Sequence, residues 1–343
     1  MSGGAGRKRR HHSRRRASAI ILNLFYEEPD DDRWLPFDRY PRRIARRVVR
    51  GRPRIGGQRR VFLNLRAGLD RIGVRYRVND YGHARRNPQE LACILGKPFV
   101  LDKMAWRNPI LFGPATFDHP ILDPELFQRC PVRRVLVPGP WIKEMWKPYW
   151  DEPVAAWPVG IDTDAWQPAS ASAKRIDVLL YDKLMWERDR YEGELIEPVR
   201  RALRVAGRSF RDIRYGFYRE EEFRAALAEC RTMIFLCEHE TQGIAYQQAL
   251  ASGVPILAWN PGGAWRDPAF YPHRITFAPV SSIPYWDERC GSEFAAAAEF
   301  ETGWSHFWDE FQRGAYDPRA YIMENLTLEK CAADYVIVAK TLA

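Results

Sequence analysis

Short apolar runs alternate with amphipathic stretches along most of this chain. The first run, Ser18–Tyr26, is almost continuously apolar, which is typical of a strand buried on both faces of a parallel sheet. A double glycine then precedes a stretch in which Phe62, Leu65 and Leu69 recur at helical spacing, and Val74–Val78 predicts the next strand. Strand, helix and strand in this order predict a parallel α/β arrangement.

The alternation continues on both sides of Trp157–Lys174, a segment rich in Pro, Gly, Ser and Ala that we interpret as a linker. The further elements that we expect are strands at 97–103, 133–140, 175–181, 212–218, 232–237, 255–259 and 274–280, and helices up to Ala206, over Glu220–Cys230, from Gly243 and over 326–343. The sequence therefore predicts two Rossmann-like, doubly wound parallel sheets in one α/β chain. Its predicted parts are a disordered basic tail (1–16), a first domain (17–158), a linker (159–174), a second domain (175–316) and closing helices (317–343).

Composition indicates an ordinary globular protein, because 46% of the 343 residues are hydrophobic and 28% are charged. No apolar run approaches the ~20 residues of a membrane-spanning helix, and the charged N-terminus lacks the apolar core of a signal peptide. The six cysteines form no C-x-x-C pair, which argues against a disulfide framework or a zinc ribbon. We therefore expect a cytoplasmic protein.

The net charge of +9 comes from the N-terminal end, since residues 1–60 contain 18 Lys and Arg but only 6 Asp and Glu. Within Pro41–Arg50, arginines surround an apolar stripe that includes Ile44 and Val48. Such a helix either lies on an anionic membrane surface or covers the first sheet. A nucleic-acid-binding protein would use the same arginines, but we see none of the recognition motifs of that class, so nucleic acid is the less favoured partner.

Candidate chemistry gathers where strands are expected to end. The Gly56–Gly57 pair before a helix leaves backbone N–H groups open to an anion, and Lys183 and Arg188 follow the first strand of the second domain. A loop with Glu240 precedes a helix that begins near Gly243. Glu238, His239 and Glu240 are adjacent in sequence, so they do not easily face one metal ion, and we expect no metal site.

These segments resemble the retaining glycosyltransferases of family 4, which have the B-type fold of two Rossmann-like domains facing a central cleft (GT-B). The resemblance is continuous from Val159 to the end and patchy before it. It rests mainly on Gly160–Pro168 at the domain junction and on Glu240–Pro255, which is similar to the donor-site signature of the family. Lys183 and Arg188 keep the spacing of the two cations of the family, with their order exchanged.

The resemblance implies transfer of a sugar from a nucleotide-sugar donor to a glycan or a lipid-linked acceptor, with retention and without a metal or another cofactor. The resemblance also implies roles for three sets of residues. A catalytic set stabilises charge on the diphosphate and binds the sugar, a second set makes further contacts with the donor, and a third lies on the acceptor side. The catalytic set is Glu240, Lys183 and Arg188, the donor set is Gly56, Gly57, Gly216, Gly243, Ile244 and Gln248, and the acceptor set is Lys103 and His83.

Two departures from the family pattern keep an alternative open. Gln248 stands where the family has a second glutamate that contacts the ribose, and Asp182 stands where it has a glycine. A glutamine still donates and accepts hydrogen bonds, whereas Asp182 adds a negative charge beside the expected phosphate site. The alternative to an enzyme is therefore a non-catalytic nucleotide- or carbohydrate-binding protein of the same fold.

Overall fold

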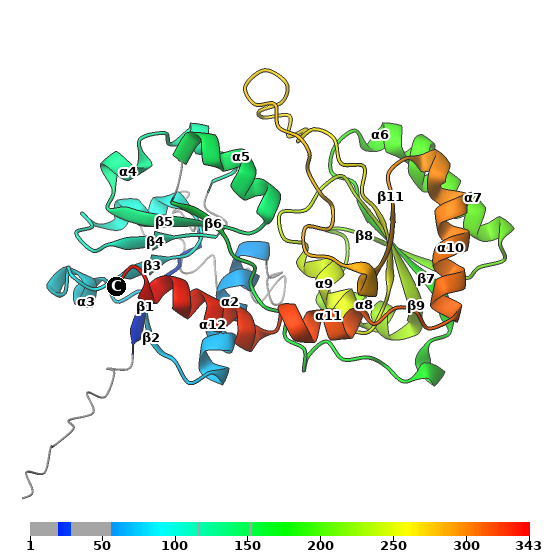
Figure 1. Cartoon of the computed structure of the whole chain (residues 1–343), viewed down its shortest axis with the longest axis horizontal. Helices are drawn as coiled ribbons and strands as arrows, with labels where there is room; N and C mark the ends of the chain where they lie inside the picture. Colours follow the sequence, from blue (N-terminus) through cyan, green and yellow to red (C-terminus); the bar gives the residue numbers. More distant parts are fainter. Residues whose placement is uncertain (1–19, 29–55, 115–116, 151–152) are drawn as a thin grey trace, which may run out of the picture.

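A computed structural model describes residues 20–28, 56–114, 117–150 and 153–343, which form two α/β domains side by side (Figure 1). The predicted tail 1–16 and the arginine-rich segment Pro41–Arg50 lie outside the described residues. Among the residues described, no helix is both long and apolar enough to cross a bilayer.

The first domain is built on a six-stranded sheet in which every pair of neighbours is parallel, in the order β2-β1-β3-β4-β5-β6. Its strands are β1 (Ile21–Phe25), β2 (Arg75–Val78), β3 (Ala92–Ile94), β4 (Ile110–Phe112), β5 (Val132–Val137) and β6 (Val154–Ala156). Four of the five residues of β1 are buried, which confirms the interpretation of Ser18–Tyr26 as an interior strand.

The helices of this domain confirm one sequence prediction and overturn another. They are α2 (Gly57–Arg71), α3 (Tyr81–Arg86), α4 (Leu126–Arg129) and α5 (Pro140–Trp150), with short 3₁₀ turns η1 (Pro98–Lys103) and η2 (Pro120–Leu122). Phe62, Leu65 and Leu69 of α2 are buried, as their spacing predicts. Residues 97–103 are not a strand, because Pro98 begins a 3₁₀ helix there, in which Val100 and Leu101 are buried and Phe99 packs partly against the core.

The second domain has a five-stranded parallel sheet in the order β11-β10-β9-β7-β8. Its strands are β7 (Ile176–Lys183), β8 (Phe210–Arg214), β9 (Cys230–Cys237), β10 (Ile256–Trp259) and β11 (Gly291–Phe294). The strand predicted at 274–280 is absent and the edge position belongs to β11. Ile275, Phe277 and Val280 pack against the first domain instead of joining the sheet.

Helices cover both faces of the second sheet (Figure 1). One group consists of α8 (Glu220–Glu229) and α9 (Ile244–Ala251), and the other of α6 (Arg188–Tyr191), the π-helical turn η4 (Glu192–Ile196), α7 (Glu197–Val205) and α10 (Phe300–Gln312). Three short turns, η3 (Ala171–Ala173), η5 (Glu288–Cys290) and η6 (Ala297–Glu299), complete the domain. The predicted helices at 220–230 and after Gly243 are confirmed.

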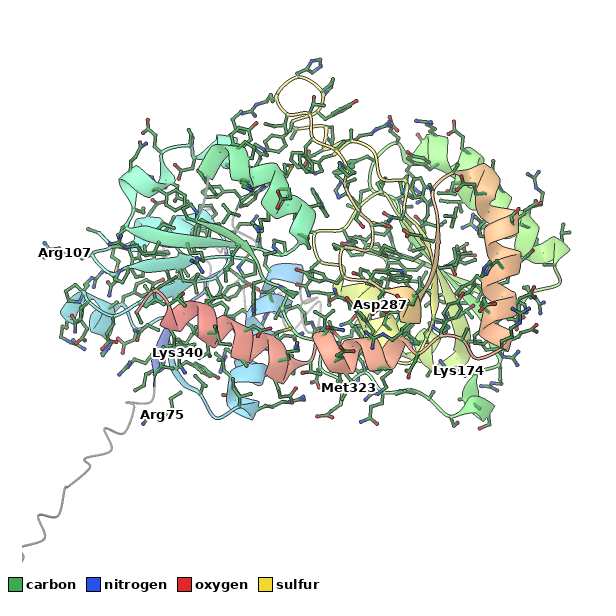
Figure 2. All side chains as sticks on the ribbon, in the orientation of Figure 1. Arg75, Arg107, Lys174, Asp287, Met323 and Lys340 are labelled. Atoms are coloured by element: carbon green, nitrogen blue, oxygen red, sulfur yellow. The ribbon has the colours of Figure 1, made fainter. Side chains whose placement is uncertain are left out.

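The end of the chain joins the domains. Helix α11 (Pro318–Asn325) packs on α9 of the second domain, and α12 (Leu328–Lys340) crosses back to pack along α2 of the first (Figure 1). Their outward side carries Met323 and Lys340 (Figure 2). On the inner side, a Cβ on Gly68 of α2 would overlap the carbonyl oxygen of Leu328. The two helix backbones therefore approach as closely as only a glycine permits.

A second bridge between the domains is the long connection between β10 and β11, residues 260–290, which runs beside α5 (yellow to orange in Figure 1). Its Trp265 and Phe270 belong to the apolar core of the first domain, together with Trp146 and Trp150 of α5. The His119 ring lies between Tyr149 of α5 and Trp265, with ring centroids 4.6 and 5.9 Å away. One continuous aromatic core therefore spans the domain boundary.

The close approach of α2 and α12 predicts that a single methyl group destabilises the protein. Gly68→Ala should lower the free energy of unfolding by about 1–3 kcal/mol, because the added Cβ forces the two helices apart. Gly57→Ala in the same helix is the matched control, since its Cβ would meet nothing within 4 Å. Urea unfolding of both variants measures the effect, and equal stability of the two would contradict this account of the helix contact.

Burial of His119 predicts a loss of stability in acid. Burial lowers the pKa of this imidazole to about 4, so the folded state keeps it neutral while the unfolded chain binds a proton below about pH 6.5. The free energy of unfolding should therefore fall by about 3 kcal/mol from this group as the pH drops from 6.5 to 4. His119→Asn removes the titration and retains an acceptor for the N–H of Ile121. Parent and variant curves of stability against pH that run parallel would refute the assignment.

Candidate functional site

The carboxyl ends of β7, β8 and β9 meet at one edge of the second sheet. Lys183, the last residue of β7, lies opposite Cys237, the last residue of β9, and Asp182 lies opposite Arg214 at the end of β8. The loop 238–243 leaves β9 at this edge and leads into α9. The fold therefore brings Lys183 and Glu240 to the same edge of the sheet. The sequence predicts this, because both residues follow predicted strands.

Lys183 and Glu240 form an ion pair at this edge. The Nζ of Lys183 donates to Oε1 of Glu240 at 2.5 Å, and both side chains are largely buried. Burial by itself would lower the pKa of Lys183, but the Glu240 carboxylate outweighs it and holds the pKa above the usual range, so the ammonium is charged. The Nζ also lies 4.6 Å from the centre of the Tyr215 ring. The site thus presents a fixed cation between a carboxylate and an aromatic face.

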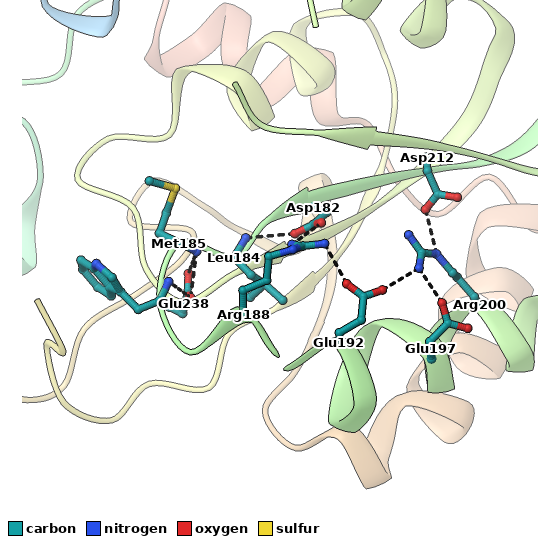
Figure 3. Close-up of polar contacts among 10 residues, drawn as sticks. Asp182, Leu184, Met185, Arg188, Glu192, Glu197, Arg200, Asp212 and Glu238 are labelled. Carbon is teal, nitrogen blue, oxygen red and sulfur yellow. Dashed lines mark hydrogen bonds and ion pairs between the residues drawn. The ribbon is translucent and has the colours of Figure 1, made fainter. Parts of the chain in front are cut away.

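Arg188 is held on the opposite face of β7. Adjacent residues of a strand point to opposite faces, so Asp182 turns away from the Lys183 side chain. Arg188 pairs with Asp182 at 2.6 Å and with Glu192 at 2.8 Å (Figure 3). The sequence resemblance sets Arg188 beside Lys183 on one ligand, whereas in the structure its charge is compensated by two carboxylates.

The contacts of Arg188 extend into a wider network (Figure 3). Glu192 also accepts a hydrogen bond from Arg200, which pairs in addition with Glu197 and Asp212. The carboxylate of Glu238 accepts hydrogen bonds from the N–H groups of Met185 and Trp186. These bonds fix the segment that follows β7 between α7 and the end of β9.

Glu238, His239 and Glu240 point to three different surroundings. Glu238 caps the Met185–Trp186 segment, Glu240 meets Lys183, and the His239 ring lies between Trp141 and Trp186 at centroid distances of 5.4 and 4.7 Å. Burial lowers the pKa of His239 to about 4, so its imidazole is neutral at pH 7. Within the described ranges, no three His, Cys, Asp or Glu side chains are grouped to hold a metal ion.

The helix that follows the loop begins at a backbone position suited to glycine. Gly243 has φ 87° and ψ 47°, and a Cβ there would overlap the ring of Tyr246. Among the residues that the structure describes, no side chain caps the first turn of α9, which begins at Ile244. The two glutamines of α9 differ: Gln247 exchanges hydrogen bonds with Gln242, whereas Gln248, a residue that is 8% exposed, makes no side-chain hydrogen bond within the described structure. Gln248 is therefore available to a ligand.

The glycines singled out in the sequence lie at open positions. A Cβ on Gly56, Gly57 or Gly216 would meet nothing within 4 Å, and Gly216 alone of the three has a positive φ, of 82°. An ion pair between Arg60 and Glu220 joins the first turn of α2 to the start of α8. The Gly56–Gly57 turn is therefore near the second domain, as the resemblance implies.

The acceptor-side candidates each contact a carboxylate of the first domain. Lys103 ends η1 and pairs with Glu27 at 3.0 Å, just beyond β1. His83, on α3 at the outer edge of the first domain (Figure 1), lies 2.8 Å from Glu90. The ionic partners of both residues belong to the first domain.

Sequence reasoning missed Tyr215 and Trp141 as site residues. Tyr215 follows β8 directly, so its place beside Lys183 is visible once the strands are in register. Trp141, at the start of α5, donates from Nε1 to the carbonyl oxygen of Glu240 at 2.7 Å. Its role depends on how the two domains meet, and no sequence pattern reports that arrangement.

No protein-family model and no curated protein matches the sequence significantly. Among solved structures, the sucrose-phosphate synthase of Thermosynechococcus elongatus is similar to this chain with a TM-score of 0.55 and 11% identity, over 94% of this chain and 98% of the synthase. WaaG, a glycosyltransferase involved in lipopolysaccharide biosynthesis, is similar with a TM-score of 0.50 and 12% identity, over 94% and 100%. The lipopolysaccharide outer core galactosyltransferase WaaB is similar with a TM-score of 0.50 and 10% identity over the same shares.

At these identities the similarity concerns the fold, and it agrees with the geometry. Two all-parallel α/β domains lie side by side, the last helix returns to the first domain, and the match extends over nearly the whole length of each chain. The chain has the GT-B fold of these glycosyltransferases.

Proposed function

We propose that this protein transfers a sugar from a nucleotide-sugar donor to a glycan or a lipid-linked acceptor. The observation that carries the proposal is the buried pair of Lys183 and Glu240 at the carboxyl edge of the second sheet, next to the uncapped start of α9. Ligands of open α/β sheets bind at the carboxyl ends of the strands. A cation and a helix N-terminus at that edge suit a diphosphate.

In the proposed reaction, the bond between the sugar and the nucleoside diphosphate breaks and negative charge grows on the departing phosphate. An acceptor hydroxyl forms the new bond to the sugar and gives its proton to the departing phosphate. The Lys183 ammonium and the backbone N–H groups at Gly243 and Ile244 stabilise this charge. Fixed donors of this kind contribute about 3–4 kcal/mol each to the rate in other enzymes. These groups take the part of a divalent cation, so we propose transfer without a metal, and with the retention that the family resemblance implies.

Arg188 is the second cation of the proposal. To reach the diphosphate it must exchange Asp182 or Glu192 for phosphate oxygens, which it can bind with the same planar fork of N–H groups. The Lys183 ammonium, by contrast, already lies on the face of β7 where we propose that the diphosphate binds. We therefore expect Lys183 to contribute more than Arg188.

The remaining contacts follow from position. Glu240 accepts hydrogen bonds from sugar hydroxyls, and the free amide of Gln248 binds the ribose. The exposed ring of Phe217, two residues after Tyr215, offers a flat surface to the base, and the Gly216 turn between them has no Cβ to block its approach. The Gly56–Gly57 turn approaches from the first domain, where Lys103 and His83 stay candidates for the acceptor side. Pro41–Arg50 stays a candidate contact with an anionic membrane.

The diphosphate assignment predicts that removing both cations abolishes turnover. The variant Lys183→Ala with Arg188→Ala should lose at least about 100-fold in sugar transfer, because the departing charge is no longer stabilised. The measurement is a screen of UDP, GDP and ADP and their sugars for thermal stabilisation, followed by product formation with the donor that stabilises the parent. The single variants divide the effect between the two residues.

Circular dichroism of the double variant serves as the control for folding. Parental rates of transfer in a folded double variant would contradict the assignment. A parent that binds a nucleoside diphosphate but neither transfers nor hydrolyses the sugar would instead support the non-catalytic binding protein.

The two neighbouring glutamines predict opposite outcomes. Gln248→Ala should weaken binding of the stabilising nucleotide about five- to tenfold and leave the melting temperature of the free protein unchanged, since its amide has no hydrogen-bond partner among the described residues. Gln247→Ala should lower the melting temperature, because it leaves buried groups of Gln242 unpaired. Calorimetric titration and thermal melts test both. A drop in melting temperature in the Gln248 variant would show that this amide serves the fold.

A further inference from the structure

Three consecutive residues of the loop 238–243, which we call the site loop, contact residues 139–159 across the domain boundary. The carbonyl oxygen of Glu240 accepts a hydrogen bond from Trp141 of α5. The carbonyl oxygen of Thr241 lies against Gly139, so closely that a Cβ on this glycine would overlap it. The Gln242 side chain bonds to both the N–H and the C=O of Val159, where the chain leaves the first domain. The loop that carries Glu240 is thus fastened along its length.

The corner of the first domain that makes these contacts, Pro138–Trp141, is held from a second direction. The hydroxyl of Tyr285 donates to the carbonyl oxygen of Pro138 at 3.0 Å. The backbone of Tyr285 in turn exchanges hydrogen bonds with the hydroxyl of Tyr246 on α9. The corner therefore lies between the site loop and the segment before β11, both of which belong to the second domain.

Trp141 is the side chain through which this corner reaches the Lys183–Glu240 pair. Its indole is 8% exposed, its Nε1–H bond to Glu240 is 2.7 Å long, and its ring meets that of His239 edge to face. The other main-chain bond of Glu240 runs from its N–H to Ser281 of the second domain. Without the bond from Trp141, the bond from its own N–H to Ser281 is the main-chain bond that Glu240 keeps within the described residues, so the residue is freer to turn.

We propose that Trp141 is a positioning residue that makes the orientation of Glu240, and with it the ion pair to Lys183, depend on contact between the two domains. The inference rests on the proposed function of that pair. When the first domain is in contact with the second, Trp141 holds the backbone of Glu240, and the Glu240 carboxylate faces Lys183. The cation is then presented in its reactive arrangement only when the domain that supplies the acceptor side is in place.

The chain provides a matched control on the same helix. Trp146 is also a buried tryptophan of α5, but its Nε1 has no hydrogen-bond partner in the described part of the chain. Trp141→Phe and Trp146→Phe remove the same atoms from neighbouring turns, and only the first removes a hydrogen bond to the site loop. A merely structural effect of losing an indole would be common to both variants.

The first readout needs no ligand. Glu240 raises the pKa of Lys183, so loosening the pair increases the fraction of neutral, reactive amine by about tenfold for each pKa unit that is lost. Acetylation of Lys183 by acetic anhydride, followed by mass spectrometry, should therefore be about tenfold faster in Trp141→Phe than in Trp146→Phe. Equal rates would overturn the inference whether or not the protein is an enzyme.

The second readout separates binding from turnover. With UDP-glucose as the probe, Trp141→Phe should lower kcat about tenfold or more while KM stays within twofold, because the variant leaves the proposed nucleotide contacts of Gln248 and of the Gly56–Gly57 turn in place. Trp146→Phe should keep both values. Unchanged kcat in Trp141→Phe would overturn the positioning role. A parent that releases no UDP contradicts the proposed function for this donor, and the acetylation rates then decide the inference alone.

Discussion

Close backbone contact between the two domains is the constraint on which the rest of this structure depends. Glycines face main-chain atoms with no room for a Cβ where the parts of the molecule meet: Gly68 of the first domain and Gly160 of the linker against the start of α12, and Gly139 against the loop after β9. Each contact removes a side-chain layer and lets backbone touch backbone, and the contact of Gly139 with Thr241 does so directly between the two domains. The position of Glu240 relative to the first domain is therefore set by main-chain geometry, which is stiffer than contact through long side chains.

The end of β7 places two differently compensated groups of charges on the two faces of the second sheet. Because Asp182 and Lys183 are adjacent on β7, they project to opposite faces, and each attracts partners of the opposite sign. On one face, Arg188 and Arg200 are surrounded by carboxylates that tie helices to the sheet. On the other, Lys183 has one carboxylate partner within the described ranges, from Glu240, and an aromatic ring, from Tyr215. The second face has the weaker compensation and is the one suited to binding an anionic ligand.

The sequence predicted the parts of the fold that rest on long periodic segments. The buried strand Ile21–Phe25, helix α2 with its stripe of Phe62, Leu65 and Leu69, and the closing helix α12 all repeat apolar residues over several turns or strand positions. Strands β3, β4 and β6 have three residues each, too few for a period to appear. Residues 274–280 alternate as a strand does, but their apolar side chains pack on another domain.

The site was predictable to the level of residue type and position after a strand. That rule placed Lys183 and Glu240 correctly at one sheet edge. It does not specify which face a side chain takes, so it grouped Arg188 with Lys183 and overlooked its pairing with Asp182. It also carries no information on contacts between domains, which is why Trp141 became visible only in three dimensions.

The connection of residues 260–290 has a consequence for how this protein is built as a unit. Trp265, Phe270 and Ile275 are encoded in the second domain yet complete the apolar interior of the first. Either half, produced alone, would leave large aromatic surfaces in water, at a cost of about 25 cal/mol for each Å². The two halves are thus separate in topology but interdependent in folding, and cutting the gene at the linker would yield fragments prone to aggregation rather than two working modules.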